Sequence, residues 1–314
     1  MIFTVSTLLL ASWLFAGQAE YQDFDASAIV SAKYLETGSG AAAAGMGNAY
    51  IGLAEGAGSV YWNPAGLISM QEKPDTFSIY FSQNIWIMDM MASQVSLARN
   101  FRKIGNFALS LSYFHAGSIE KTSVDGAGDP LPLENQTYSP YSLVFMGSYA
   151  AMLEGDIGFG MNLKYLLDSI DGDAAHTAAF DIGIRYVMPF HRNLSLNITA
   201  KNFGGSFNGS LLPKEMAFAA GYRLSIGDYT IGAGYDVCGR VANNPVHRTG
   251  IEVKTPFFMV FRTGYQSDNT AVEEGFRNFT FGAGINLGDK YIDFAFEPYG
   301  ELGAAYKVSF GGDF

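Results

Sequence analysis

Apolar and polar residues alternate along most of the chain, from Asp75 to the C-terminus. In residues 229–237, tyrosine, isoleucine, alanine and valine occupy the odd positions, and threonine, glycine and aspartate the even ones. Such alternation places one face of a strand in an apolar medium and the other in a polar space. We count about fourteen runs, each close to the ~9–11 residues that a tilted membrane strand needs. The predicted strands lie near 76–83, 91–101, 106–117, 138–151, 156–167, 177–187, 193–202, 215–224, 228–238, 247–254, 257–266, 277–287, 290–297 and 303–314.

Short and long connections alternate between these runs. Every second connection is short, and the others are longer and more polar. The longest connection is 118–137. Bacterial outer-membrane barrels have this pattern, with tight turns on the periplasmic side and long loops outside. Residues 75–314 are therefore predicted to form an all-β, transmembrane antiparallel β-barrel of about fourteen strands in the outer membrane of a Gram-negative-type bacterium. The predicted short turns are 102–105, 152–155, 188–192, 225–227, 255–256 and 288–289.

The last predicted strand places aromatic and apolar residues on one face, and the sequence stops on Phe314. An aromatic ending after an alternating strand resembles the C-terminal signal read by the barrel assembly machinery. We therefore expect that machinery, together with membrane lipid, to be a partner of the chain.

Residues 1–19 are predicted to be a signal peptide. Their apolar core spans 7–16, and Gly17 and Ala19 are small residues at the positions that signal peptidase requires. The segment lacks the usual basic residues near its start, and a membrane anchor is the alternative interpretation. The apolar run is short of the ~20 residues of a spanning helix, so we expect cleavage after Ala19.

Residues 20–74 do not alternate, and part of them is rich in glycine and alanine. Glycine accepts positive φ, and small side chains allow backbones to approach closely, so this segment can fold tightly. Gly45 and Gly47 invite comparison with a nucleotide-binding loop. The third glycine and the preceding buried strand are missing, which argues against that interpretation.

The string GAAAAGMGNAYIGLAEGAGSVYWNPAGL, within residues 35–67, resembles the N-terminal signature of the PorV/PorQ-like branch of the FadL outer-membrane superfamily. The resemblance implies that residues 20–74 fold into the barrel lumen as a hatch or plug. FadL-type members move hydrophobic molecules across the outer membrane, and PorV-type members carry cargo proteins in type IX secretion. The hatch motif consists of Gly45, Gly47, Asn63, Pro64 and Ala65.

Asn63 before Pro64 suits a tight turn, because proline fixes φ and asparagine can bond to nearby backbone. The motif can therefore be interpreted as closing the plug without binding a ligand.

Charged residues make up only 16% of the chain, and the net charge of −11 argues against nucleic acid as a partner. Cys238 is the single cysteine, and the four histidines are scattered without metal-ligand spacing. No local signature of a hydrolase is present, so we expect neither an enzyme, nor a metal, nor a cofactor. Asp168, Asp171 and Asp173 could bind Ca²⁺, but they lack the other EF-hand ligands, and an ordinary solvated acidic loop is preferred.

Charges on the polar faces of the predicted strands must point into the lumen, because Arg or Lys facing lipid costs ~2–4 kcal/mol at mid-membrane. Their mixed signs suggest ion pairs across the lumen and to the hatch. The candidate lumen charges are Lys164, Asp181, Arg185, Arg223, Asp236, Glu252 and Arg262. A patch at 85–91, rich in methionine and containing Trp86, is either a docking surface for hydrophobic ligands or part of the membrane-interface rim.

Two functional hypotheses follow, with a purely structural barrel as a third. The first is passage of small hydrophobic molecules through a hatch-gated barrel. The second is a PorV-like, non-enzymatic role in protein secretion or surface attachment, with secreted protein as cargo. A continuous apolar pocket between hatch and wall would favour the first, and a solid lumen with large ordered external loops would favour the second.

Overall fold

The computed structural model describes residues 30–72, 75–126, 129–153, 155–207, 209–240, 244–267, 278–300 and 303–314. The expected signal peptide and its cleavage site lie outside the described residues. Among the described residues, no helix is both long enough and apolar enough to cross a membrane.

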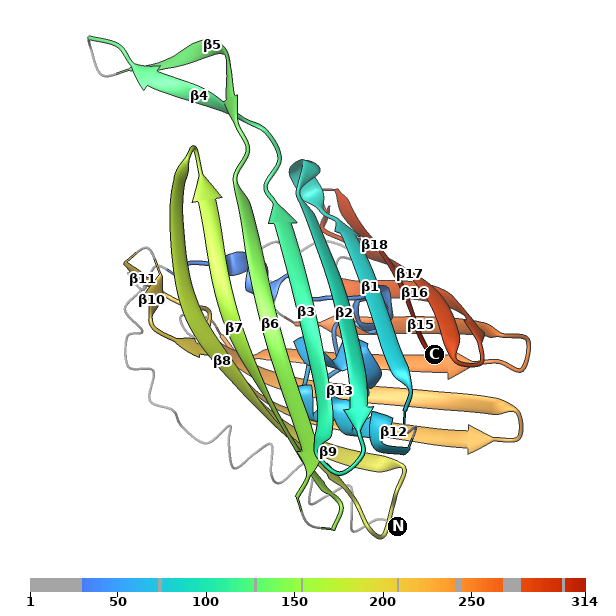
Figure 1. Ribbon diagram of the computed structural model, residues 1–314. Helices are drawn as coiled ribbons and strands as arrows, with labels where there is room; N and C mark the ends of the chain where they lie inside the picture. Colours follow the sequence, from blue (N-terminus) through green and yellow to red (C-terminus); the bar gives the residue numbers. More distant parts are fainter. Residues whose placement is uncertain are drawn as a thin grey trace.

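Fourteen antiparallel strands close into a barrel, as the alternation predicts (Figure 1). Each strand pairs with its neighbour along the chain, and β1 pairs with β18 to close the ring. The strands are β1 (Phe77–Ile85), β2 (Met91–Phe101), β3 (Gly105–His115), β6 (Tyr141–Met152), β7 (Ile157–Ile170), β8 (Asp173–Val187), β9 (Leu194–Gly204), β12 (Glu215–Ile226), β13 (Tyr229–Arg240), β14 (Val246–Lys254), β15 (Met259–Gln266), β16 (Phe279–Leu287), β17 (Lys290–Pro298) and β18 (Ala304–Asp313).

The two faces of the barrel wall differ in chemistry. On β3, Leu109 points outward and is 72% exposed, whereas its neighbours Ala108 and Ser110 point inward and are buried. Large apolar side chains are exposed in the same way on strand after strand around the ring. An apolar surface of this extent requires lipid around it.

All six predicted short turns lie at one end of the barrel, and the remaining connections lie at the other, long-loop end. One prediction was wrong, because β7 and β8 extend through the expected loop at 168–173 and are joined only by Asp171 and Gly172. Both residues have positive φ, of 52° and 94°. This is the geometry of a two-residue hairpin turn, for which Asp-Gly is a strong signal.

The longest connection contains a second sheet. Strands β4 (Ile119–Val124) and β5 (Pro130–Tyr138) form a hairpin that projects beyond the barrel (Figure 1). Lys121 of this hairpin forms an ion pair with Asp171 at the tip of the β7–β8 hairpin. The connection between β9 and β12 carries a smaller hairpin, β10 (Ser206–Phe207) and β11 (Ser210–Leu211), and that between β1 and β2 contains η4 (Ile87–Asp89).

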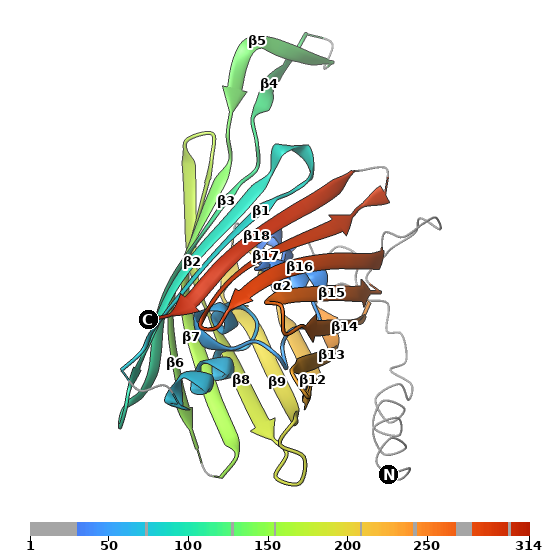
Figure 2. The same cartoon turned by 90° about the vertical axis from the view of Figure 1, so that its right-hand side faces the viewer.

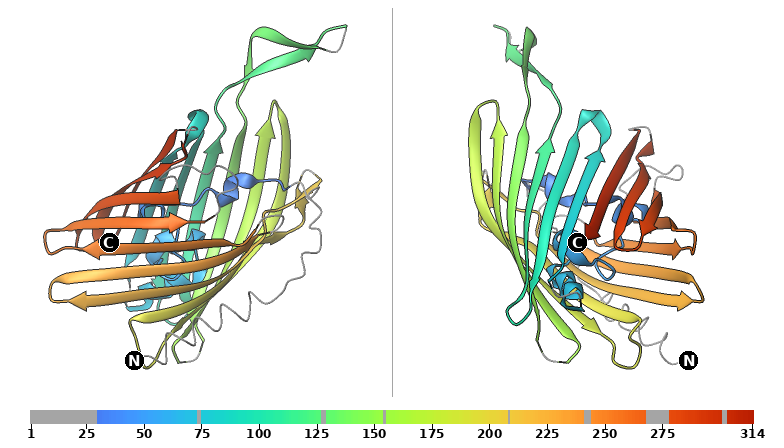
Figure 3. Two further views of the ribbon diagram at one scale, coloured as in Figure 1. Left: turned by 180° about the vertical axis from the view of Figure 1, so that it is seen from behind. Right: turned by 45° about the vertical axis from the view of Figure 1, so that its right-hand side comes forward.

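Residues 30–72, called the inner segment below, lie inside the ring of strands (Figures 2 and 3). The segment starts at the long-loop end, where Val30 bridges to Leu211, and leads to the start of β1 at the short-turn end. It contains η1 (Lys33–Glu36), α2 (Ala41–Gly45), η2 (Gly56–Tyr61) and η3 (Pro64–Glu72). Its buried apolar residues, with inward-facing wall residues, form the core of the molecule.

Candidate functional site

A row of four glycines crosses the inner wall of the barrel. Gly221, Gly234, Gly250 and Gly264 are successive cross-strand partners on β12, β13, β14 and β15. Residues 46–52 of the inner segment run across this row, and a Cβ atom added to any of the four glycines would overlap their backbone. The wall is therefore shaped to receive the main chain of the inner segment at van der Waals distance.

The hatch-motif glycines lie against the same side of the wall. A Cβ on Gly45 would lie 2.8 Å from the Cα of Gly282 and 3.3 Å from the Cβ of Arg262. Gly47 has φ +61°, and its N–H donates to Thr280 Oγ1 at 2.8 Å. Both positions accept only glycine, one because of close approach and the other also because of its backbone angle.

The Asn63-Pro64-Ala65 triplet packs against β7, β8 and β9. Asn63 Oδ1 accepts the N–H of Ala65 at 3.0 Å, and its Nδ2 donates to Asn197 Oδ1 at 3.1 Å. Pro64 and Ala65 lie on Gly160, where a side chain would overlap their backbone. Both the oxygen and the nitrogen of the Asn63 amide therefore form hydrogen bonds within the protein.

The candidate lumen charges all point inward, and most form ion pairs within the wall. Lys164 pairs with Asp181 at 2.8 Å, and Arg262 pairs with Glu252 and with Asp293, each at 2.7 Å. Asp236 instead binds the inner segment, because its Oδ2 accepts the N–H groups of Tyr50 and Ile51 at 3.1 and 3.2 Å. These charges anchor the segment and one another, without forming a lumen of one sign.

Arg185 and Arg223 hold the inner segment near the short-turn end. Arg223 donates to the carbonyl of Leu53 at 2.9 Å, Arg185 donates to that of Ala54 at 3.2 Å, and both pair with Glu55. Burial by itself raises the pKa of Glu55, but the two guanidinium groups outweigh it and keep the pKa below its ordinary value. We call Glu55, Arg185 and Arg223 the latch.

A pocket opens at the long-loop end, between the inner segment and the wall. This mouth pocket has a volume of about 350 Å³ and is bounded by Tyr34, Trp86, Met90, Phe114, Tyr141 and Asp168, among others. The patch expected at 85–91 is thus divided, since Trp86 and Met90 line the pocket whereas Met88 is 80% exposed. The volume of the mouth pocket lies within the ordinary range of small-molecule sites.

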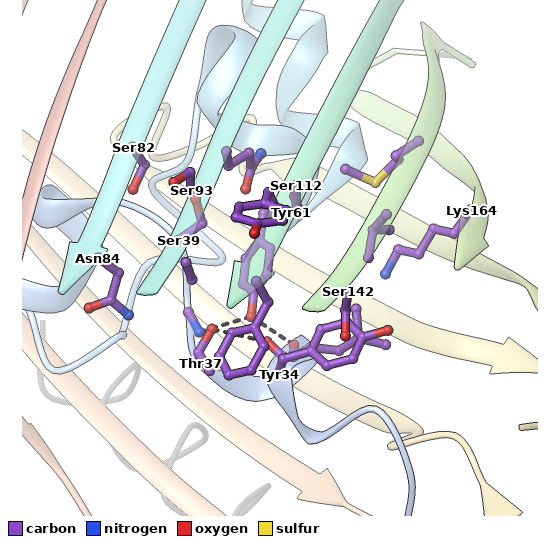
Figure 4. A pocket seen from close by; sticks show the side chains of 18 residues that line it. Tyr34, Thr37, Ser39, Tyr61, Ser82, Asn84, Ser93, Ser112, Ser142 and Lys164 are labelled. Atoms are coloured by element: carbon purple, nitrogen blue, oxygen red, sulfur yellow. Dashed lines mark hydrogen bonds between the residues drawn. The ribbon is translucent and has the colours of Figure 1, made fainter. Parts of the chain in front are cut away.

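A smaller cavity of about 50 Å³, the inner cavity, lies deeper in the lumen (Figure 4). Tyr34, Phe114 and Ser142 line both spaces and therefore lie between them. Figure 4 shows the hydroxyl-bearing side chains that surround the cavity. The wall residues that line the cavity include members of two adjacent cross-strand rows: Asn84, Ala92, Phe114 and Ser142; and Ser82, Gln94, Ser112 and Val144.

Two contacts hold the Tyr34 side chain against the wall between the two spaces. Its ring stacks on Phe114, with centroids 5.6 Å apart and planes 20° from parallel, and its hydroxyl donates to Asp168 Oδ1 at 2.8 Å. Beyond it, the Tyr61 hydroxyl accepts the N–H of Gly38 and donates to the carbonyl of Leu35.

Sequence reasoning did not find Tyr34, Phe114 or Ser142, and it assigned Asp168 to an external acidic loop. In the structure Asp168 faces the lumen and binds Tyr34, whereas Asp171 pairs with Lys121 outside. The alternation of β3, β6 and β7 could have identified the inward faces. It could not have shown that these residues share one row, which depends on strand register.

Comparison with solved structures identifies the fold. The CymD monoaromatic hydrocarbon channel has a TM-score of 0.55 and 11% identity, with 88% of this chain and 96% of that chain covered. The Ralstonia pickettii toluene transporter TbuX has a TM-score of 0.53 and 12% identity, with 87% and 97% covered. The P. putida toluene transporter TodX has a TM-score of 0.51 and 12% identity, with 86% and 98% covered.

No protein-family model matches the sequence, and no curated protein matches it. At identities near 11%, the structural likeness shows the fold. It does not show the superfamily, or the PorV/PorQ branch, that the N-terminal signature resembles. This fold and the apolar outer face together confirm the predicted transmembrane β-barrel.

Proposed function

We propose that this barrel passes small hydrophobic molecules across the outer membrane, and that the inner segment is the hatch that gates it. The observation that carries the proposal is the mouth pocket, which lies next to the inner cavity and shares the lining residues Tyr34, Phe114 and Ser142 with it. Such a molecule is bound and released without bond-making chemistry, so the proposed protein is a channel and not an enzyme.

The structure corresponds to the closed state in this proposal. An engineered protein cavity of ~150 Å³ binds benzene. The inner cavity, at about 50 Å³, is far smaller, so a ring-sized molecule requires the inner segment to move. Tyr34 controls entry from the mouth pocket, and the latch holds the segment at Glu55, near the short-turn end of the barrel.

The hatch motif has a positioning role in this proposal. Gly45 and Gly47 allow close contact with the wall, and Asn63-Pro64-Ala65 shapes the turn that lies on Gly160. The proposed hatch domain is 20–74, followed by the barrel at 75–314. The motif residues bind no ligand, because their polar groups are used to hold the segment in place.

The comparison proteins give independent support, since their names describe transport of toluene or monoaromatic hydrocarbon. Uptake of toluene and of p-cresol by liposomes containing the purified barrel tests the proposal. Uptake of at least one of them faster than into protein-free liposomes is expected, and protein-free rates for both would contradict it. Assembly into the membrane requires lipid and the barrel assembly machinery, the partners proposed from the last strand.

A second candidate is the PorV-like role in type IX secretion or surface attachment, with a secreted protein as cargo. The observation that favours it is the projecting β4–β5 hairpin, on which Val124 is 72% exposed and Leu131 51% exposed. Deleting 118–138 separates the two candidates. Loss of cargo from the cell surface with unchanged toluene uptake supports the second, and the reverse supports the first.

A further inference from the structure

The Tyr34 side chain occupies a site that the barrel wall forms on its own. Phe114, Ser142 and Asp168 are consecutive members of one cross-strand row on β3, β6 and β7, and all three face the lumen. Neighbouring strands lie ~4.8 Å apart, so Phe114 and Asp168 are two strand spacings apart, and the single side chain of Tyr34 contacts both. An aromatic ring, a hydroxyl and a carboxylate are thus presented in a line at one edge of the mouth pocket.

The ring and the hydroxyl of Tyr34 each contact one member of this row. Its ring stacks on Phe114, and its hydroxyl donates to Asp168 at 2.8 Å. Burial, followed by the charge of Asp168, raises the pKa of Tyr34 well above its ordinary value, so the hydroxyl stays protonated and remains a donor. The atoms in contact with the wall are those of a phenol attached to the inner segment.

We propose that the row Phe114, Ser142 and Asp168 is a binding site for phenols, small aromatic rings that carry a hydroxyl, and that Tyr34 occupies this site while the barrel is closed. This rests on the proposed passage of small hydrophobic molecules and names their chemical class. A phenol in the mouth pocket replaces Tyr34 on the row. Displacement of Tyr34 then joins the mouth pocket to the inner cavity, which couples recognition to opening.

Asp168 decides the class of ligand. A plain hydrocarbon such as toluene can stack on Phe114, but it leaves the carboxylate without the donor that Tyr34 now provides. An aromatic carboxylate such as benzoate brings a second negative charge beside Asp168. A phenol alone satisfies both the ring and the carboxylate.

The test uses the full-length protein and three probes: p-cresol, toluene and benzoate. Tyr34→Ala vacates the site, and binding is measured by titration calorimetry on barrels whose heat-modifiable migration shows that they are folded. We expect Tyr34→Ala to bind p-cresol about tenfold more tightly than toluene, and benzoate most weakly, the size expected for one hydrogen bond to a charged acceptor. Adding Asp168→Leu should abolish that preference, whereas adding Asp173→Leu, an exposed carboxylate of the same hairpin, should leave it intact.

Equal affinity of Tyr34→Ala for p-cresol and toluene, or a preference unchanged by Asp168→Leu, would overturn the proposal. Tyr34→Phe covers the case in which Tyr34→Ala does not assemble. This variant keeps the ring and loses the hydroxyl that binds Asp168. Its affinity for p-cresol should therefore be several-fold higher than that of the wild type, in which p-cresol must displace the Tyr34 side chain. Unchanged affinity would again overturn the proposal.

A liposome uptake assay on the wild type separates this inference from the proposed function. If the wild-type barrel takes up neither toluene nor p-cresol, passage itself is contradicted. Uptake of toluene as fast as that of p-cresol leaves passage standing and rejects the phenol site.

Discussion

The backbone of Gly52 in the inner segment lies directly against the backbone of Gly221 in β12, with no side chain between them. A Cβ atom on Gly52 would lie 2.5 Å from the nitrogen of Gly221, closer than real Cβ contacts allow. The inner segment is therefore held where it is partly by the absence of side chains on the wall. A substitution at a wall glycine can therefore remove the close contact with the inner segment without breaking the hydrogen bonds between the strands.

Gly221→Val should displace the inner segment and leave the barrel assembled, because the added methyl groups overlap the backbone of Gly52. Larger single-channel conductance in planar bilayers than in the wild type is the expected result. Gly147→Val is the matched control, since Gly147 of β6 has nothing within 4 Å of its Cβ position. Equal conductance of both variants would show that the glycine row does not seat the segment.

Charge on the outer face should block assembly. Leu109 lies in the middle of β3 and is 72% exposed, so Leu109→Arg places a cation in the hydrocarbon region at a cost of ~2–4 kcal/mol. The folded fraction on unboiled gels measures the effect. Leu131→Arg, on the projecting β5 strand, should assemble normally, and similar damage from both changes would mean that Leu109 does not face lipid.

The latch should make conductance dependent on pH. A carboxylate whose pKa is lower in the folded protein stabilises the fold above its unfolded pKa, and that stability is lost as the pH falls through the folded pKa. Glu55 meets this condition, and its side chain is 40% exposed, so protons reach it. We expect conductance to rise only below about pH 4.5, the ordinary pKa of the group.

Glu55→Gln should raise conductance at neutral pH and remove this pH step. Asp75→Asn is the control, because Asp75 pairs with Arg102 of the β2–β3 turn and not with the latch. A pH step that persists in Glu55→Gln would assign the dependence to another group.

Asn63→Ala distinguishes a structural motif from a ligand site. The change removes the bonds to Ala65 and Asn197 and leaves buried polar groups unpaired, which costs about 1–3 kcal/mol for each. We expect a lower unfolding midpoint with an unchanged ratio of p-cresol to toluene uptake. A changed ratio with an unchanged midpoint would place Asn63 in the ligand path.

The barrel could be predicted from the sequence because its signals are local. Alternation fixes the face of each residue within a strand, and the predicted short turns all lie at one end of the barrel. The prediction is wrong at 168–173, because the tight Asp171-Gly172 turn lets β7 and β8 continue through this acidic stretch.

The site could not be predicted, because it depends on long-range register. Tyr34 and Asp168 are 134 residues apart, and no local pattern pairs a residue of the inner segment with a strand. The alternation indicates only that the wall glycines lie on the inner faces of their strands. Their alignment into one row appears only when β12 to β15 are placed side by side.

A reversible lock on the inner segment tests the central claim most directly. The N–H of Ala41 donates to Ser309 Oγ of β18 at 3.1 Å, which brings Ala41→Cys and Ser309→Cys within reach of a disulfide. In liposomes, the oxidised double variant should take up toluene no faster than protein-free vesicles, and reduction should restore the wild-type rate, while each single variant responds to neither treatment. Uptake at the wild-type rate by the oxidised, locked barrel would contradict passage gated by the inner segment.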